Sequence, residues 1–143
     1  MSLADRVRDL LRKPKVPALG VDDEGLEIVA EAFDAVEADS SVLARSPAWV
    51  AENPAVLRHH LALPADRIPD AAAILAQDGW ELREVREVDG RVVTHALRVQ
   101  RLDALHCAQE RARMAGLAQR LGGDSLGWDA LQPLPLRDEG HGR

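Results

Sequence analysis

The sequence predicts a mixed α+β fold, and three observations carry that prediction. Stretches of alternating apolar residues mark strands, other stretches have apolar residues at helical spacing, and a strand–helix–strand unit occurs twice. The chain has 143 residues, 46% of them hydrophobic and 29% charged, which is typical of one globular domain. Its single cysteine, Cys107, excludes an internal disulfide and a cysteine-rich zinc site.

Helical patterns dominate the first part of the chain. Apolar residues fall at helical spacing over 3–11, and again over 26–36 after the acidic residues 22–24, which suit a helix start. Ser46 followed by Pro47 is a helix-start signal, so a third short helix is expected to end near residue 53. We interpret residues 1–56 as an N-terminal helical segment packed against the rest of the domain.

A strand-rich pattern begins at Leu57. The expected elements are strands over 57–63, 80–88, 91–99 and 126–131, and helices over 69–77 and 103–121. Gly79 lies where a helix C-terminal cap belongs, and Asp103 is a good N-cap. Asp89-Gly90 between two strand patterns is a strong hairpin signal. Residues 57–134 therefore form the α+β core, and 135–143 are expected to be a disordered tail.

An internal repeat specifies the predicted topology. The segment 59–63 (HHLAL) resembles 95–99 (HALRV), and Gly79-Trp80 resembles Gly127-Trp128. Two strand–helix–strand units in series make βαββαβ, the ferredoxin-like arrangement, with both helices on one face of a four-stranded antiparallel sheet. In this interpretation the first and third strands lie side by side and run parallel. Both tryptophans are expected to pack against the helices.

Two histidines, His59 and His95, are candidates for chemistry because each shares the apolar phase of its strand. If those strands are adjacent, the two imidazoles approach one another and titrate as a coupled pair. Such a pair would support a pH switch, a histidine-dependent reaction or weak metal binding, although two ligands are too few for a tight metal site. The alternative is two buried histidines bonded to backbone groups.

A second candidate site uses the opposite sheet face. His60 should point to that face, where Arg58 and Arg98 would bind a carboxylate or phosphate. The alternative is ordinary salt bridging with nearby glutamates. The neighbouring His106 and Cys107 are not expected to form a nucleophilic pair, because successive helix residues diverge by about 100°.

Charge and composition limit the classes of partner. The net charge of −6 and pI of about 5.3 argue against a nucleic-acid partner. No apolar run approaches the roughly 20 residues of a membrane span, and the charged N-terminus does not resemble a signal peptide. We therefore expect a cytoplasmic protein without a cofactor, and the excess of arginine over lysine suggests a bacterial source.

The two His-x-Leu-x-Leu/Val strands, each followed by a helix and a Gly-Trp strand, resemble the repeated halves of the bacterial regulator of ribonuclease E activity B family. The resemblance covers about Leu57 to Leu134, and implies a ferredoxin-like fold that binds a ribonuclease and performs no chemistry. The sequence also lacks recognisable catalytic motifs.

We therefore expect a non-enzymatic protein-interaction or regulatory module, with another protein as its partner and a homodimer as an option. Two alternatives remain open. One is a small-molecule or anion sensor that uses the open sheet face, and the other is a histidine-dependent enzyme.

Overall fold

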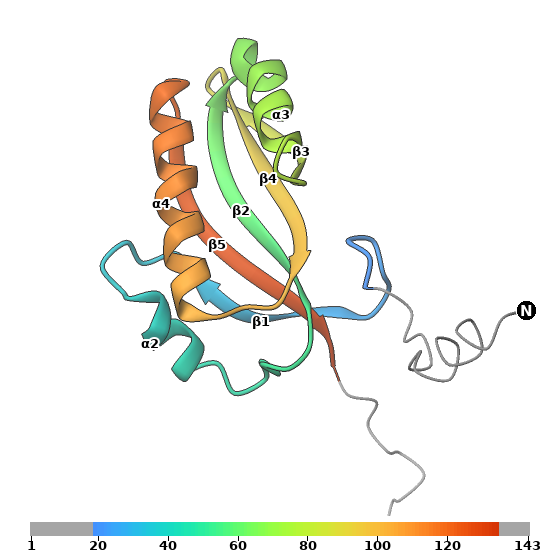
Figure 1. Cartoon of the computed structure of the whole chain (residues 1–143). Helices are drawn as coiled ribbons and strands as arrows, with labels where there is room; N and C mark the ends of the chain where they lie inside the picture. Colours follow the sequence, from blue (N-terminus) through green and yellow to red (C-terminus); the bar gives the residue numbers. More distant parts are fainter. Residues whose placement is uncertain (1–18, 135–143) are drawn as a thin grey trace, which may run out of the picture.

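A five-stranded antiparallel sheet organises the computed structural model, which describes residues 19–134 (Figure 1). The strands lie in the order β1-β5-β2-β4-β3. The elements along the chain are β1 (Leu26–Ala32), α2 (Asp39–Ala44), β2 (Ala55–Pro64), a 3₁₀ turn (Ala65–Arg67), α3 (Ile68–Ala76), β3 (Glu81–Val88), β4 (Arg91–Gln100), α4 (Ala104–Arg120) and β5 (Asp124–Pro133).

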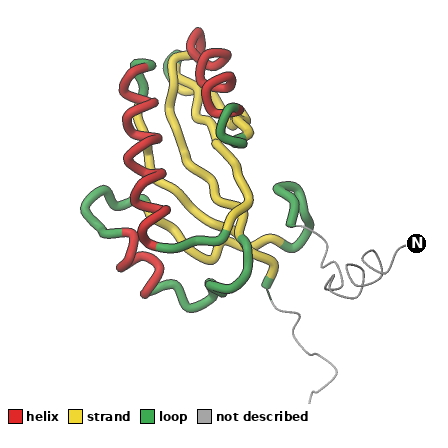
Figure 2. The backbone as a smooth tube through the Cα atoms, in the orientation of Figure 1, coloured by secondary structure: helices red, strands yellow, loops and turns green. Residues whose placement is uncertain are grey.

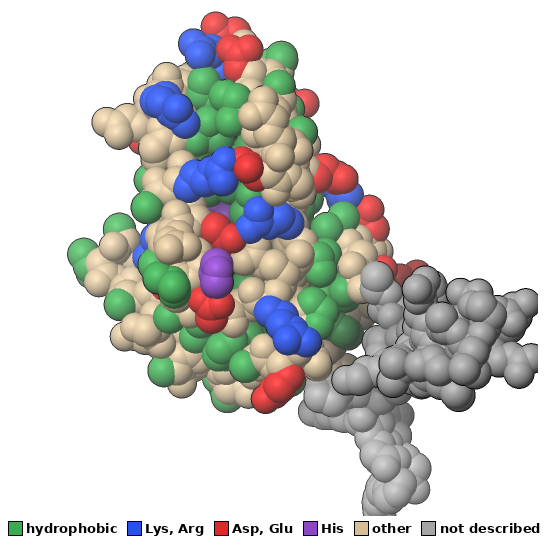
Figure 3. All heavy atoms as spheres, viewed as in Figure 1, with side chains coloured by type: hydrophobic (Ala, Val, Ile, Leu, Met, Phe, Trp, Pro, Cys, Tyr) green, Lys and Arg blue, Asp and Glu red, His purple; other side chains and the backbone are tan. Residues whose placement is uncertain are grey.

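The helices cover one face of the sheet, and the core lies beneath them (Figure 2). Alternate residues of β2 supply its centre, and Leu57, Leu61 and Leu63 are fully buried there together with Met114 and Leu117 of α4. On the outer surface of this side, basic and acidic side chains are interspersed with apolar ones (Figure 3). We call the opposite face, which carries the remaining residues of β2, the open face.

The helix expected over 26–36 is wrong, because residues 26–32 form strand β1. β1 pairs antiparallel with β5, from Leu26 opposite Pro133 to Ala32 opposite Trp128. Gly25 precedes it with a positive φ of 76°, a conformation that does not continue a helix. The first part of the chain therefore contributes a strand to the same sheet as the predicted core.

The short helix expected after Ser46 is also wrong. A helix lies before it, at Asp39–Ala44, and residues 47–53 form turns. The Ser46 hydroxyl donates a hydrogen bond to the carbonyl of Val42, 2.5 Å away, so this residue closes one helix and does not begin another. The helix expected over 3–11 and the tail 135–143 lie outside the described residues.

The elements expected after Leu57 are confirmed within a few residues. Asp89 and Gly90 form the β3–β4 turn with φ values of 51° and 79°, as an Asp-Gly hairpin requires. The expectation that the first and third strands of the core run parallel is wrong, because β2 and β4 are antiparallel. The crossover helix α3 joins β2 to β3, which run in the same direction, and β4 returns from β3 through a hairpin, so β4 runs opposite to β2.

Candidate functional site on the open sheet face

The pairing of β2 with both its neighbours assembles a polar cluster on the open face. His60 lies opposite His95 of β4, and Arg58 lies opposite Asp129 of β5. Phe33, immediately after β1, reaches His60 from the neighbouring edge. We call Phe33, Arg58, His60, His95 and Asp129 the open-face cluster.

Aromatic contacts form a row across this face. The ring centroids of Phe33 and His60 are 5.0 Å apart at an interplanar angle of 84°, and those of His60 and His95 are 4.3 Å apart at 62°. Both are edge-to-face contacts, the geometry that aromatic quadrupoles favour. The side chain of Phe33 is 47% exposed, so one end of the row is open to a partner.

Asp129 anchors the row to the sheet. Its carboxylate accepts hydrogen bonds from Arg58 Nε (2.7 Å) and from a terminal nitrogen of the same guanidinium (2.5 Å), and it lies 3.0 Å from His60 Nε2. Burial favours the protonated carboxyl, but the hydrogen bonds from Arg58 and His60 outweigh burial and lower the pKa of Asp129. The ionised carboxylate therefore fixes the orientation of both side chains.

His95 is the neutral end of the row. Burial lowers its pKa to about 4, and the nearby His60, Arg58 and Arg86 act in the same direction. An imidazole with that pKa carries no charge near pH 7. The site therefore presents an uncharged ring on the sheet, with Arg58, Arg86 and the carboxylate of Asp129 nearby.

The expected pair of His59 and His95 does not form. His60, and not His59, lies opposite His95, and successive strand residues point to opposite faces. His59 is 1% exposed on the helix-covered face, with its ring 5.2 Å from that of Trp80. Neither of its ring nitrogens has a hydrogen-bond partner among the described residues, and burial lowers its pKa to about 3.

The expected combination of Arg58 with Arg98 does not form either. Arg98 lies opposite Leu57 and so points to the helix-covered face. Its guanidinium carbon lies 4.1 Å from the centre of the Trp80 ring, and the group binds Glu110 and Gln100. The two arginines therefore bind separate carboxylates on opposite faces of the sheet.

Trp80 and Trp128 pack on the helix-covered side, as expected. Trp80 is 3% exposed, and the indole of Trp128 donates a 3.1 Å hydrogen bond to Asp39. Cys107 is buried, and burial raises the pKa of its thiol to about 12, whereas the ring of His106 is exposed and binds Asp103. The contrast agrees with the expectation that His106 and Cys107 do not act as a pair.

Sequence reasoning missed Phe33 and Asp129. Phe33 falls within the stretch 26–36, whose spacing predicts a helix, although it is the only phenylalanine of the chain. Asp129 follows Trp128 in the strand predicted over 126–131, and that local pattern does not distinguish it from an ordinary surface carboxylate. Its role depends on pairing with Arg58, 71 residues earlier in the chain.

No family model, curated protein or solved structure matches this chain. In residues 19–134, no group of three or more His, Cys, Asp or Glu side chains is placed to hold a metal ion. No helix of the described part is long and apolar enough to cross a membrane. The geometry of the open face is therefore the basis for a functional proposal.

Proposed function

We propose that this chain is a non-enzymatic protein-interaction or regulatory module of the bacterial cytosol, which binds another protein through the open face of its sheet. The observation that carries the proposal is the row formed by Phe33, His60 and His95. Aromatic side chains and arginines are enriched at the centres of protein interfaces, where they contribute much of the binding energy. The open-face cluster offers both types of side chain on a rigid sheet.

Exposed apolar side chains extend this surface beyond the cluster. Ile28 and Val88 lie on the open face at positions paired with Leu131 and Arg91, and are 45% and 49% exposed. They belong to β1 and β3, the two edge strands, so exposed apolar side chains lie at both edges of the open face. A surface of this kind suits a protein partner better than a small ligand, because it is broad.

We also propose that β2 to β5 form a ferredoxin-like unit. Four antiparallel strands in the order β5-β2-β4-β3, with α3 and α4 as their crossovers, support this assignment. β1 and α2 would then be additions to one edge of that unit. The resemblance to the regulator of ribonuclease E activity B family would make a ribonuclease one class of partner to test.

A second candidate function, anion sensing, draws on the charge around His95. After burial, the charges of His60, Arg58 and Arg86 lower the pKa of this ring and that of Asp129 raises it, so an anion would find more than one basic side chain nearby. A carboxylate or phosphate bound there would raise the pKa of His95. Titration with inorganic phosphate, followed by the NMR signal of the His95 ring, tests this function, and an unchanged pKa would exclude it.

Affinity capture with matched baits tests the leading proposal. His95→Glu places a negative charge near Arg58 and Arg86 and changes the centre of the open face. Leu105→Glu is the control, because Leu105 is 64% exposed on α4, on the helix-covered side. We expect wild type and Leu105→Glu to retain one stoichiometric partner from the native cytosol, and His95→Glu to lose it.

Three other outcomes would oppose the proposal. The partner would be held elsewhere if His95→Glu kept it and Leu105→Glu lost it. Capture of no protein by any bait would favour the anion-sensing alternative. Sedimentation of the purified protein as a dimer that His95→Glu dissociates would mean that a second copy occupies the face.

A further inference from the structure

The first residues of β5 have a free edge. β1 ends at Ala32, which pairs with Trp128, whereas β5 begins four residues earlier, at Asp124. Ala32 and Phe33 lie against Gly127, but in the described part of the chain no strand lies beside residues 124–126 on the side of β1. Backbone N–H and C=O groups on such an edge are available to pair with another extended chain.

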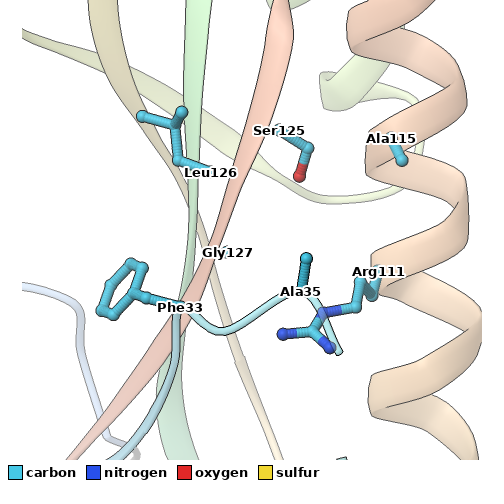
Figure 4. Close-up of a pocket in the computed structure, with 7 residues that line it drawn as sticks. All are labelled: Phe33, Ala35, Arg111, Ala115, Ser125, Leu126 and Gly127. Atoms are coloured by element: carbon cyan, nitrogen blue, oxygen red, sulfur yellow. The ribbon is translucent and has the colours of Figure 1, made fainter. Parts of the chain in front are cut away.

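A hollow of about 200 Å³ lies beside this free edge (Figure 4). Ala35, Ala115 and Ser125 line it on the side of α4, and all three are small. Phe33 and Leu126 lie on its other side and are 47% and 43% exposed. The hollow is therefore open to solvent and mostly apolar.

The chemistry of the hollow favours a single aliphatic side chain as its occupant. Sites for small-molecule ligands usually enclose about 300–1,000 Å³, which is more than this hollow provides. Among the described residues that line it, Arg111 is the one that is charged. Its guanidinium already binds the carbonyls of Ala32 and Glu37 and the carboxylate of Asp39. An anionic group would have to displace these contacts, whereas an aliphatic group would not.

The two outer edges of the sheet are protected against strand addition, in contrast to residues 124–126. β3 alternates charged residues along its length and has an irregularity at Val85. β1 has one at Val29 and carries Glu27 and Glu31. Charges and bulges on edge strands discourage pairing with other chains.

We propose that the free edge of β5 binds an extended segment of a partner protein as an added strand. Backbone hydrogen bonds to residues 124–126 hold the segment over about 10 Å of strand. One aliphatic side chain of the segment fills the hollow, and the next packs against Phe33 and Leu126. The proposal rests on the proposed function, in which the partner is a protein, and specifies how part of that partner is held.

The probe is a displayed library of random 12-residue peptides, selected on the full-length protein. We expect enrichment of peptides with two consecutive aliphatic residues and no neighbouring proline. Synthetic copies of the enriched peptides would then be titrated into wild type, Ala115→Arg and Ala112→Arg. Ala115→Arg fills the hollow and should weaken binding at least tenfold, whereas Ala112→Arg adds the same side chain at an exposed position of α4 that does not line it.

N-methylation of the peptide tests the backbone pairing. Methylation of alternate peptide nitrogens should abolish binding in one register and leave it intact in the other, because only every second N–H of an added strand faces β5. Lack of enrichment, equal binding by wild type and Ala115→Arg, or indifference to N-methylation would each overturn the inference. A dimer that Ala115→Arg dissociates would assign the edge to a second copy and would also overturn it.

The failure of this inference is distinguishable from failure of the proposed function. If Ala115→Arg captures the native partner normally while His95→Glu loses it, the open face binds the partner and the free edge does not. If neither variant changes capture, both proposals fail.

Discussion

Replacing His59 by leucine should stabilise the protein, because the histidine ring is buried without hydrogen bonds. Both ring nitrogens lie without a partner among the described residues, in a side chain that is 1% exposed. A buried polar group left unsatisfied costs about 1–3 kcal/mol. Leucine has a similar volume, so repacking should cost less than about 1.5 kcal/mol. We expect a net gain of about 1 kcal/mol in the free energy of unfolding at pH 7.

The pH dependence of the free energy of unfolding gives a second, independent measure of what the buried His59 ring costs. The pKa of His59 is lowered from 6.5 to about 3 in the folded protein. Below pH 6.5 the His59 ring therefore binds a proton in the unfolded chain but not in the folded one. The free energy of unfolding falls as pH falls from 6.5 towards 3. Between pH 7 and pH 5 this ring should cost the wild type about 2 kcal/mol, a loss that His59→Leu avoids.

Urea unfolding at pH 7, 6 and 5 measures both effects. The advantage of His59→Leu over wild type should grow from about 1 kcal/mol at pH 7 to about 3 kcal/mol at pH 5. His106→Gln removes an exposed ring instead, and should change stability at pH 7 by less than about 0.5 kcal/mol. Parallel pH profiles for wild type and His59→Leu would refute the reasoning, even if leucine packs poorly, because the slope does not depend on packing.

Three further predictions concern the open-face cluster, the strand residue Gly127 and the buried Cys107. Asp129→Asn removes the carboxylate shared by the open-face cluster and should lower the free energy of unfolding by about 3 kcal/mol. Asp124→Asn, at an exposed position, should lower it by less than about 1 kcal/mol. Equal losses would contradict the role of Asp129. Gly127 has a φ of 128°, and a Cβ there would lie 2.3 Å from the carbonyl oxygen of Ala32. Gly127→Ala should therefore cost more than about 3 kcal/mol in thermal unfolding, while the unobstructed Gly90→Ala costs about 1 kcal/mol. Burial raises the pKa of Cys107 to about 12. Iodoacetamide at pH 8 should therefore modify this thiol at least about 1,000-fold more slowly in the native protein than in the unfolded chain. Rapid modification of the native protein would show instead that the thiol is accessible.

The strands with strict alternation could be predicted from sequence, and β1 could not. In β2, Leu57, Leu61 and Leu63 fall on one alternate phase, in which His59 is the only polar member, and this spacing fits a strand. In β1, the irregularity at Val29 interrupts the alternation, so the apolar residues fit helical spacing equally well. Pairing with β5, 100 residues further along the chain, decides between them, and local patterns carry no information about that pairing.

The candidate site was predicted only in part, because it depends on strand register. The sequence identified His60 and Arg58 as residues of the open face. Which histidine of β2 meets His95 depends on the β2–β4 register, and a shift of one residue exchanges the two faces. The sequence could not set that register, so His59 was paired with His95.

The central claim, that the open face contacts a partner protein, is tested most directly by site-specific photo-crosslinking in the native cells. Benzoylphenylalanine would replace Arg86, an exposed residue of the open face that lies opposite Val93 and whose charge acts on His95. In a second variant it would replace Leu105 on the helix-covered side. We expect one discrete crosslinked product from position 86 and none from position 105. A product from position 105 alone, or from neither position, would contradict the claim.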